Sequence, residues 1–329
     1  MPRSSPIPLL LVRDRLNPDA LARDTSLLLV RRGVYAERAT WHALTPWDRY
    51  LARVHAVALS WRHPVFCLES AAALHGQPVF DEPRDIHLLG ETGWHVGDVR
   101  VHGSSDGRAI VEADGIRMTD LAATAVDLCR VLQPAQALAV ADATMRMLGT
   151  SLDFAELGAA QASRRGIRQL RWVQEHARMK SESVGEVFSR AVIGWLGFHE
   201  PDLQVEFRTE GCLDRVDFCW RRQGVLGESD GYGKYDASDP VAMKAHFVAE
   251  KRREDRLRRR PDVRGFARWD WSDTIRYEPL DRALRAAGLV PQRPRQLAML
   301  ATLAVNPRAV RRRDKSMPTN RERRGLGSS

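Results

Sequence analysis

Hydrophobic and polar positions in the C-terminal half of the chain predict a layered α/β domain. A helix is expected to begin at Ser183-x-x-Glu186, and a long basic helix to run from about Asp239 to Arg259. Strands are expected at 203–207, 215–220, 225–228 and 266–269, with a closing helix at 280–287. The order helix, three strands, helix, strand, helix is typical of an α/β sandwich around a mixed sheet.

The N-terminal half predicts a mixture of helices and short strands. Helices are expected at 17–23, 46–60, 69–75, 119–132 and 134–148, and strands at 27–30, at 66–68 and between 86 and 105. Gly76, with Pro78 beyond it, is typical of a helix end. Residues 159–180 are rich in arginine and predict a basic helix with a solvated face, which would connect the two halves.

A hairpin is expected near the N-terminus, with Arg31, Arg32 and Gly33 in its turn. Arginines at the tip of a hairpin suit a wing that lies against DNA phosphates. Arg31 and Arg32 are therefore candidate DNA-binding residues. A plain surface hairpin agrees equally well with this stretch of sequence.

Length and charge add a domain count and a class of partner. The chain has 329 residues, which suggests two domains. A net charge of +9 favours a polyanionic partner. Eight of the basic residues lie between Arg308 and Arg324, against two acids. This tail is expected to be disordered, and both a solvated chain end and a DNA-binding segment explain its composition.

Cysteine and hydropathy patterns indicate the compartment. The four cysteines contain no CxxC pair and no zinc spacing, and histidines such as His87 and His102 share no metal-ligand spacing. Reduced thiols in the core or in strands are the expectation for a cytoplasmic protein. No stretch approaches the length that spans a membrane, so no membrane partner is expected.

Two acids interrupt the apolar strands of the C-terminal half. Asp217 stands in the middle of one strand, and Glu228 ends the next strand eleven residues later. A buried acid is costly unless it is paired or metal-bound. Two acids on neighbouring strands can share Mg²⁺, which would polarise a phosphate and activate a water. The alternative is a structural role, with Asp217 paired to Arg215 or Arg252.

A third acid, Glu186, has two candidate roles. Ser183-x-x-Glu186 matches a capping box, in which the glutamate satisfies the amides at the start of the helix. Nuclease cores also place a carboxylate on their first helix, close to the metal. One conformer cannot serve both roles fully, and the cap is favoured.

A set of short motifs between 181 and 290 resembles the very-short-patch-repair (Vsr)-like branch of the PD-(D/E)XK nucleases. The motifs are Gly185-Glu186, Gln204, Val216-Asp217-Phe218, Gly227-Glu228-Ser229-Asp230-Gly231, Lys234-Tyr235 and Glu250-Lys251-Arg252-Arg253-Glu254-Asp255. The resemblance implies a restriction-endonuclease-like fold with Mg²⁺ as cofactor. Asp217 and Glu228 would bind the metal, and Glu186 would be the catalytic acid of the first helix.

The chain departs from this family at one catalytic position. Asp230 stands where the family has a lysine, two residues after the second acid. The resemblance therefore leaves Lys234 or Lys251 to contact the phosphate from elsewhere. Arg252 and Arg253, in the same basic helix as Lys251, are the expected DNA-binding residues of this half.

Residues 15–150 resemble AbiEi-type antitoxins of type IV toxin–antitoxin systems. The motifs are Val30-Arg31-Arg32-Gly33-Val34-Tyr35, the stretch from Leu68 to Gly76, and the helix from Thr119 to Leu128. Such antitoxins join a winged helix-turn-helix to an antitoxin domain and repress their own promoters. Too few residues precede the expected wing for a complete helix-turn-helix.

Together these resemblances predict a bacterial fusion protein with five regions. They are a degenerate winged-helix region (1–60), an antitoxin-like α+β region (61–150), a basic connector (151–180), a Vsr-like endonuclease-fold domain (181–290) and a helix with a basic tail (291–329). One expected function is that of a Mg²⁺-dependent DNA endonuclease or nickase. The other is that of a non-catalytic DNA-binding repressor with a cognate toxin. Convergence of Asp217 and Glu228 beside a lysine would distinguish them.

Overall fold

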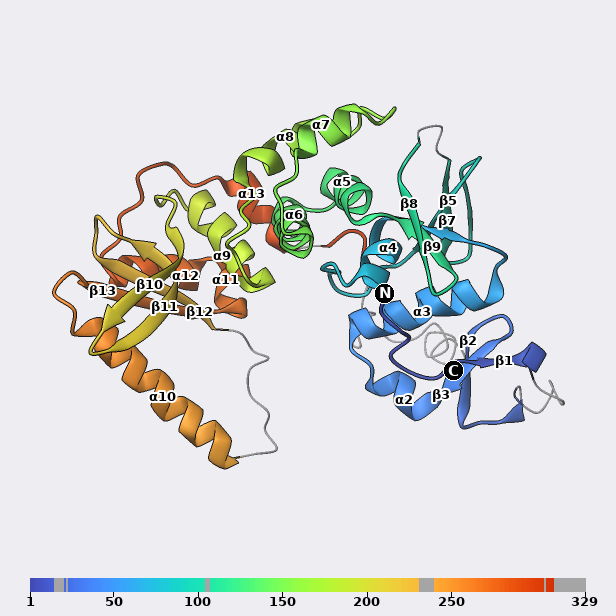
Figure 1. The fold of residues 1–329 in the computed structure, drawn as a ribbon, viewed down its shortest axis with the longest axis horizontal. Helices are drawn as coiled ribbons and strands as arrows, with labels where there is room; N and C mark the ends of the chain where they lie inside the picture. The colour runs from blue at the N-terminus through green and yellow to red at the C-terminus, as the bar shows by residue number, and fades with distance from the viewer. Residues whose placement is uncertain (15–20, 22, 104–106, 231–239, 305, 311–329) are drawn as a thin grey trace, which may run out of the picture.

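A computed structural model describes the chain except residues 15–20, 22, 104–106, 231–239, 305 and 311–329. For residues 240–247 it describes the backbone alone. The chain forms two lobes with helices between them (Figure 1). Helices and mixed sheets alternate in both lobes, so the expected α/β class is confirmed. No described helix has the length and apolar character needed to cross a bilayer.

The C-terminal lobe is built on a mixed four-stranded sheet. Its strands, in spatial order, are β10 (Asp202–Thr209), β11 (Cys212–Trp220), β12 (Val225–Asp230) and β13 (Gly265–Asp270). The first three are antiparallel neighbours, and β13 runs parallel to β12. All four strands were predicted from the apolar pattern, and the mixed sheet is confirmed.

Helices cover both faces of this sheet. They are α9 (Val184–Trp195), α10 (Pro240–Arg258), α11 (Trp271–Arg276) and α12 (Glu278–Ala286). Residues of α9 and α12 share a core with Phe218 and Trp269 of the sheet. Leu257 of α10 packs with Val216 and Leu226 in a second core. Adjacent strand residues divide between the two cores, as Phe218 and Cys219 do, so α9 and α10 lie on opposite faces. Only α11 was missing from the prediction.

The N-terminal lobe contains a six-stranded mixed sheet. Its spatial order is β6 (Trp94–Val96), β7 (Val99–Gly103), β5 (Ile86–Gly90), β4 (Val65–Phe66), β9 (Ile116–Thr119) and β8 (Ile110–Ala113). The longer helices of this lobe are α3 (Pro46–Ser60), α4 (Leu68–His75), α5 (Leu121–Val131) and α6 (Pro134–Leu148). All four were predicted. Gly76 ends α4 in the left-handed conformation, as expected.

The expected N-terminal hairpin is present. Strands β2 (Leu27–Arg31) and β3 (Val34–Glu37) pair antiparallel around Gly33, whose φ is +82°. The short strand β1 (Leu10–Leu11) adds to β3, and α2 (Arg38–Ala43) follows the hairpin. The predicted helix at 17–23 falls largely outside the described residues.

The predicted continuous helix at 159–180 is wrong. The chain forms α7 (Phe154–Ala159) and α8 (Ile167–His176) instead. Gly166 begins α8 in the left-handed conformation, and a Cβ there would lie 2.6 Å from the carbonyl oxygen of Arg130. Leu170 and Val173 of α8 are fully buried in the core that also contains α5 and α6. One face of α8 therefore packs on the core, and Arg168 and Arg171 remain exposed on the solvated face that the sequence predicted.

A buried ion pair joins the two halves. Nη2 of Arg190 on α9 lies 2.7 Å from Oδ2 of Asp142 on α6, and the two side chains are 4% and 0% exposed. Burial raises the pKa of Asp142 to about 6, and Arg190 counteracts the rise. Apolar residues of α6 and α9 belong to one hydrophobic core.

The chain also returns from the C-terminal lobe to the N-terminal one. After α13 (Leu297–Leu300) and a 3₁₀ turn (Ala301–Leu303), residues 306–310 lie against the N-terminal lobe near α4 (Figure 1). Arg84 N donates to the Arg308 carbonyl at 2.9 Å, and Val310 N donates to the Glu82 carbonyl at 2.8 Å. The expectation of a disordered tail is therefore wrong for residues 308–310, and residues 311–329 lie outside the described part.

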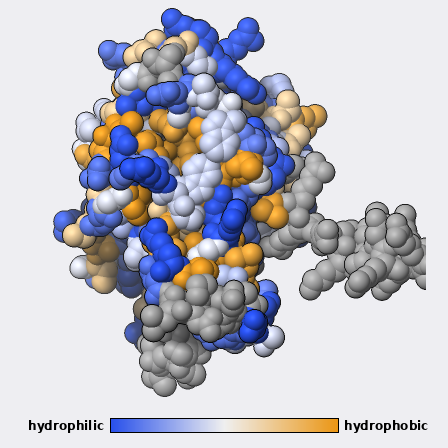
Figure 2. Space-filling model, turned by 90° about the vertical axis from the view of Figure 1, so that its right-hand side faces the viewer, coloured by the Kyte–Doolittle hydropathy of each residue, from blue (hydrophilic) through white to orange (hydrophobic). Residues whose placement is uncertain are grey.

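One face of the N-terminal lobe gathers hydrophobic side chains in its middle, with hydrophilic ones around them (Figure 2). Leu29, Trp94 and Val96 are among the large apolar side chains of the N-terminal lobe that are exposed. The ring of Trp94 stacks on that of Trp61, with centroids 5.5 Å apart.

Candidate functional site

Glu186 caps the helix that carries it. Its N–H donates to Oγ of Ser183 at 3.1 Å, and that hydroxyl donates to Oε1 of Glu186 at 2.8 Å. The backbone N–H of Glu182 donates to Oε2 at 2.9 Å. Ser183 is the N-cap of α9, as predicted, and the carboxylate of Glu186 bonds to the N-cap hydroxyl and to the N–H of Glu182, one residue before the N-cap of the predicted capping box.

Gln204 links Glu186 to Asp217. Its side-chain amide donates to Oε2 of Glu186 at 2.7 Å and to Oδ1 of Asp217 at 3.1 Å. The other oxygen of Asp217 accepts the backbone N–H of Ser229 at 3.0 Å. Gln204 has a φ of +53°, so the backbone of β10 is locally strained where this amide bridges the two acids. Both oxygens of Asp217 are thus occupied by N–H donors.

Glu228 is buried against two arginines. Nη2 of Arg253, on α10, donates to Oε2 of Glu228 at 2.6 Å, and Nη2 of Arg268, on β13, lies 3.7 Å from the same oxygen. Arg253 also donates to Glu250 and to the Arg215 carbonyl. The positive charge beside Glu228 is therefore supplied by the protein itself.

The environment of Glu228 changes its ionisation. Burial raises its pKa to about 7, and the neighbouring Arg253 and Arg268 counteract part of that rise. Only 5% of the residue is exposed. A carboxyl group with a pKa near neutrality in an ion-pair network is a candidate functional group, although structural networks shift pKa values too.

Two of the three acids, Glu186 and Asp217, meet at the side-chain amide of Gln204, and Glu228 has other partners. Antiparallel pairing of Phe218 with Gly227 sets Asp217 and Glu228 side by side on neighbouring strands. Asp217 accepts from Gln204, which also bonds to Glu186 of α9, whereas Glu228 accepts from Arg253 of α10. In the part of the chain that the structure describes, no group of three or more His, Cys, Asp or Glu side chains could hold a metal ion.

This arrangement does not suit Mg²⁺. The ion needs several oxygen ligands in near-octahedral geometry, some of them waters. The oxygens of Asp217 accept amide protons, and those of Glu228 face a guanidinium. Lys251 is exposed on α10 and makes no ion pair among the described residues. Lys234 lies outside the described residues.

The expected DNA-binding arginines fall into two groups. Arg31 is 2.9 Å from Asp98 and lies over the Trp61 ring, and Arg253 points inward to Glu228. Arg32 at the hairpin tip and Arg252 on α10 are exposed. Only the second group is therefore placed to contact a partner without breaking an existing contact.

Sequence reasoning missed the role of Arg268. It lies directly beside Glu228 in the parallel register of β12 and β13, and it also pairs with Asp230 at 2.7 Å. The signal was an arginine inside the apolar strand at 266–269. The contact of Arg268 with Glu228 depends on the pairing of β13 with β12, and the local sequence pattern does not predict which strands pair.

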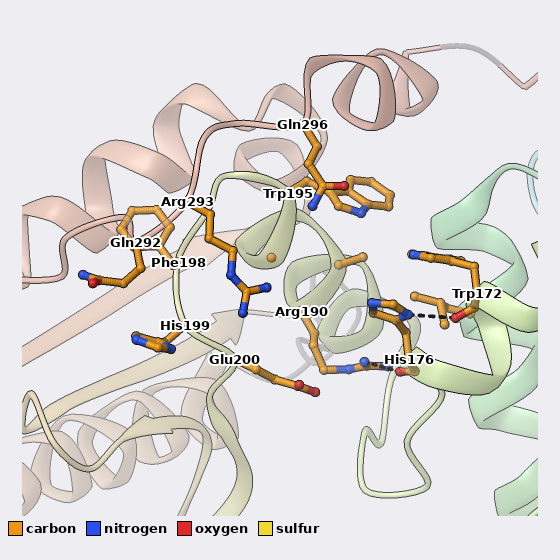
Figure 3. Close-up of a pocket in the computed structure, with 13 residues that line it drawn as sticks. Trp172, His176, Arg190, Trp195, Phe198, His199, Glu200, Gln292, Arg293 and Gln296 are labelled. Carbon is orange, nitrogen blue, oxygen red and sulfur yellow. Dashed lines mark hydrogen bonds between the residues drawn. The ribbon is translucent and has the colours of Figure 1, made fainter.

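A cavity of about 260 Å³ lies where α8, α9 and the segment 292–296 meet. Figure 3 shows Trp172 and His176 on one side of it and Arg293 reaching in from another. Nη1 of Arg190 donates to the His176 carbonyl, whereas its buried Nε has no hydrogen-bond partner among the described residues. None of the residues predicted from the sequence lines this cavity.

Comparison with known proteins places this chain in a family with two mycobacterial proteins. Its fold is a mixed α/β fold in which a buried glutamate of β12, Glu228, lies beside Arg253 and Arg268. The chain is 31% identical over 246 residues to two uncharacterized proteins of Mycobacterium tuberculosis, MT2308 of strain CDC 1551 and Rv2248 of strain H37Rv. The match covers 73% of this chain and 84% of each relative, so the chain belongs to their family. No model of a protein family matches it, and no solved structure matches it.

Proposed function

We propose that this protein is a DNA-binding regulator whose C-terminal nuclease-type domain serves as a platform for DNA and does not cut it. The Arg253–Glu228 pair carries this proposal. In this pair the guanidinium of Arg253 bonds to the carboxylate of Glu228, which a catalytic metal would need as a ligand. Arg268 adds a second positive charge on the same side. Glu228 therefore has a structural role in the described arrangement.

The order of elements supports a DNA-acting fold. A helix, three antiparallel strands, a helix and a parallel strand follow one another from α9 to β13, as the resemblance to Vsr-like nucleases implies. Exposed basic side chains at Lys251 and Arg252, together with the net charge of +9, favour a polyanionic partner.

The N-terminal lobe supports the regulatory part of the proposal. Its hairpin presents Arg32 at the tip, as a wing would present it to a phosphate. The lobe resembles AbiEi-type antitoxins in sequence, so a cognate toxin is the proposed protein partner. Exposed apolar side chains such as Trp94 and Val96 are the kind of surface that protein partners cover.

A DNA endonuclease or nickase is the second candidate function. It is favoured by the position of Asp217 and Glu228 on adjacent strands and by the raised pKa of Glu228. Arg253 would have to release Glu228 before the two carboxylates could serve any metal, since its guanidinium donates to that carboxylate. The second function therefore requires a rearrangement of α10 or of the Arg253 side chain.

Fluorescence anisotropy with a labelled duplex tests DNA binding. Affinity should fall steeply between about 50 and 200 mM salt, because phosphate contacts release counterions. The double substitution Lys251→Gln/Arg252→Gln should weaken binding and reduce the salt slope by about two, one for each lost contact. Arg282→Gln, an exposed arginine on α12, is the matched control. An affinity that does not change with salt would contradict the proposal. The same salt slope in the Lys251→Gln/Arg252→Gln variant and in the Arg282→Gln control would also contradict it.

A further inference from the structure

A large cavity opens in the N-terminal lobe, far along the chain from Asp217 and Glu228. Its volume is about 650 Å³, within the range of small-molecule sites. It lies among α4, β5, β7 and the C-terminal end of α5. Pro307 and Arg308 of the returning C-terminal segment complete its wall.

Positive charge dominates the lining of this cavity. Six arginines contribute to it: Arg84, Arg100, Arg108, Arg130, Arg165 and Arg308. The acids of the lining are Asp85 and Asp127. Glu69 lies behind Arg308 and pairs with it. The arginines therefore outnumber the acids around the cavity, which favours an anionic ligand.

Two of the arginines are held in fixed positions. Nε and Nη2 of Arg108 donate to the two oxygens of Asp127 at 2.9 and 3.1 Å. Arg308 makes a similar two-point contact with Glu69, with Nη2 at 2.7 Å from Oε2. Such forks orient a guanidinium before any ligand arrives, so less entropy is lost on binding.

Other arginines are open to solvent. The Arg100 side chain is 45% exposed, and its Nε lies 3.3 Å from Oδ2 of Asp85. Arg165 is exposed, and its side chain makes no ion pair with the described residues. These two can reorient toward an incoming anion at little cost to the fold.

A pair of histidines contributes hydrogen-bonding groups without charge. Nδ1 of His87 lies 2.9 Å from Nε2 of His102, so one ring donates to the other. Burial lowers the pKa of His87 to about 4, and burial also lowers that of His102. At neutral pH the positive charge of the cavity therefore comes from its arginines.

We propose that this cavity binds a phosphorylated small molecule of nucleotide size. Guanidinium groups match the geometry of phosphate oxygens, which accept two parallel hydrogen bonds, and the exposed Arg100 and Arg165 can turn such an edge toward the ligand. The volume exceeds what a single phosphate fills, and Leu68, Leu89 and Val131 give the cavity an apolar wall for the rest of the ligand. The ligand would contact both the N-terminal lobe and the C-terminal segment through Arg308.

Titration calorimetry of the full chain with ATP tests the proposal, with pyrophosphate and adenosine as the separate parts of the probe. ATP should bind one to one, pyrophosphate should compete with it, and adenosine should give no heat at the same concentrations. The double substitution Arg100→Gln/Arg165→Gln should weaken ATP binding at least about tenfold, because two charge-assisted contacts are lost. Arg282→Gln should bind ATP as the parent does.

Three results would overturn the proposal. They are no heat from ATP or pyrophosphate at millimolar concentration, unchanged ATP affinity in the Arg100→Gln/Arg165→Gln variant, and displacement of ATP by a duplex oligonucleotide. The last result would assign the cavity to DNA phosphates. Because both substituted side chains are exposed, the variant is expected to melt as the parent does, and thermal melting by circular dichroism checks that it is folded.

Discussion

Arg253 on α10 donates to Glu228 on β12 at 2.6 Å, and the carboxylate it meets is almost completely buried. A buried acid needs a cation or several hydrogen-bond donors. This chain provides a guanidinium at the position where the sequence predicted a metal ion. A guanidinium beside Glu228 agrees with a DNA-binding platform, whereas a metal ion there would agree with a metal-dependent nuclease.

Removal of Arg253 should destabilise the protein. Arg253→Ala leaves Glu228 buried without its closest cation, which costs about 3 kcal/mol for a pair of this kind. Arg259→Ala is the matched control just beyond the end of α10, since Arg259 and its partner Glu210 are both more than half exposed. The control should cost less than about 1 kcal/mol. Urea denaturation measures both values, and equal losses would mean that the Arg253 pair has no special weight.

The pKa of Glu228 predicts a pH dependence. Its folded pKa of about 7 exceeds the ordinary value of 4.5, so the folded state holds this proton more tightly than the unfolded state. Stability from this group is full below pH 4.5 and falls as pH rises toward 7.

Glu228→Gln removes that dependence. The difference in unfolding free energy between variant and parent should therefore shift in favour of the variant by about 3 kcal/mol from pH 4.5 to pH 7, which is about 1.4 kcal/mol for each pKa unit. Urea denaturation at several pH values measures the shift. A shift in the opposite sense would show that Arg253 lowers the pKa of Glu228 below its ordinary value.

Asp217→Asn should reduce stability moderately. An asparagine side chain has one acceptor oxygen, so it cannot accept both the Gln204 amide and the Ser229 N–H in the present geometry. A buried donor without a partner costs about 1–3 kcal/mol. Asp202→Asn, at an exposed pair with Arg221, is the control and should change little. A neutral or stabilising Asp217→Asn would instead indicate relief of repulsion between acids, as a metal site predicts.

The returning C-terminal segment should contribute to stability through Arg308. Its partner Glu69 is buried, with 4% of its side chain exposed, so Arg308→Ala leaves that carboxylate with the His87 ring in place of a guanidinium. The expected loss is about 3–5 kcal/mol. Arg276→Ala, at an exposed pair with Asp273, should lose less than about 1 kcal/mol in the same thermal or urea unfolding series. Similar melting of both variants would show that the segment packs without stabilising the lobe.

Much of the fold was predictable because local patterns determine its elements. The apolar positions of α3 and α6 repeat at helical spacing, and Gly76 and Pro46 stand at helix ends. The sequence also contained a signal for the inward direction of Arg253, since the apolar Leu257 lies one helical turn later on the same side of the helix. Phase along α10 therefore distinguishes the inward Arg253 from the exposed Arg252.

Other features depend on contacts between distant parts of the chain. Arg308 pairs with Glu69 across 239 residues, and no local pattern signals that contact. The break at Gly166 arises because the backbone must pass close to Arg130. Gln204 was part of the family resemblance, but its bridge between Glu186 and Asp217 depends on the pairing of β10 with β11.

A single gel of supercoiled plasmid tests the central claim most directly. The plasmid is incubated with the protein at low salt in EDTA or in Mg²⁺, and each sample is run before and after protease digestion. We expect retardation in both buffers and intact supercoiled plasmid after digestion. Nicked circles that form only with Mg²⁺, and not with Asp217→Asn, would contradict the claim and establish the endonuclease. Plasmid that is not retarded in either buffer would show that the protein does not bind DNA.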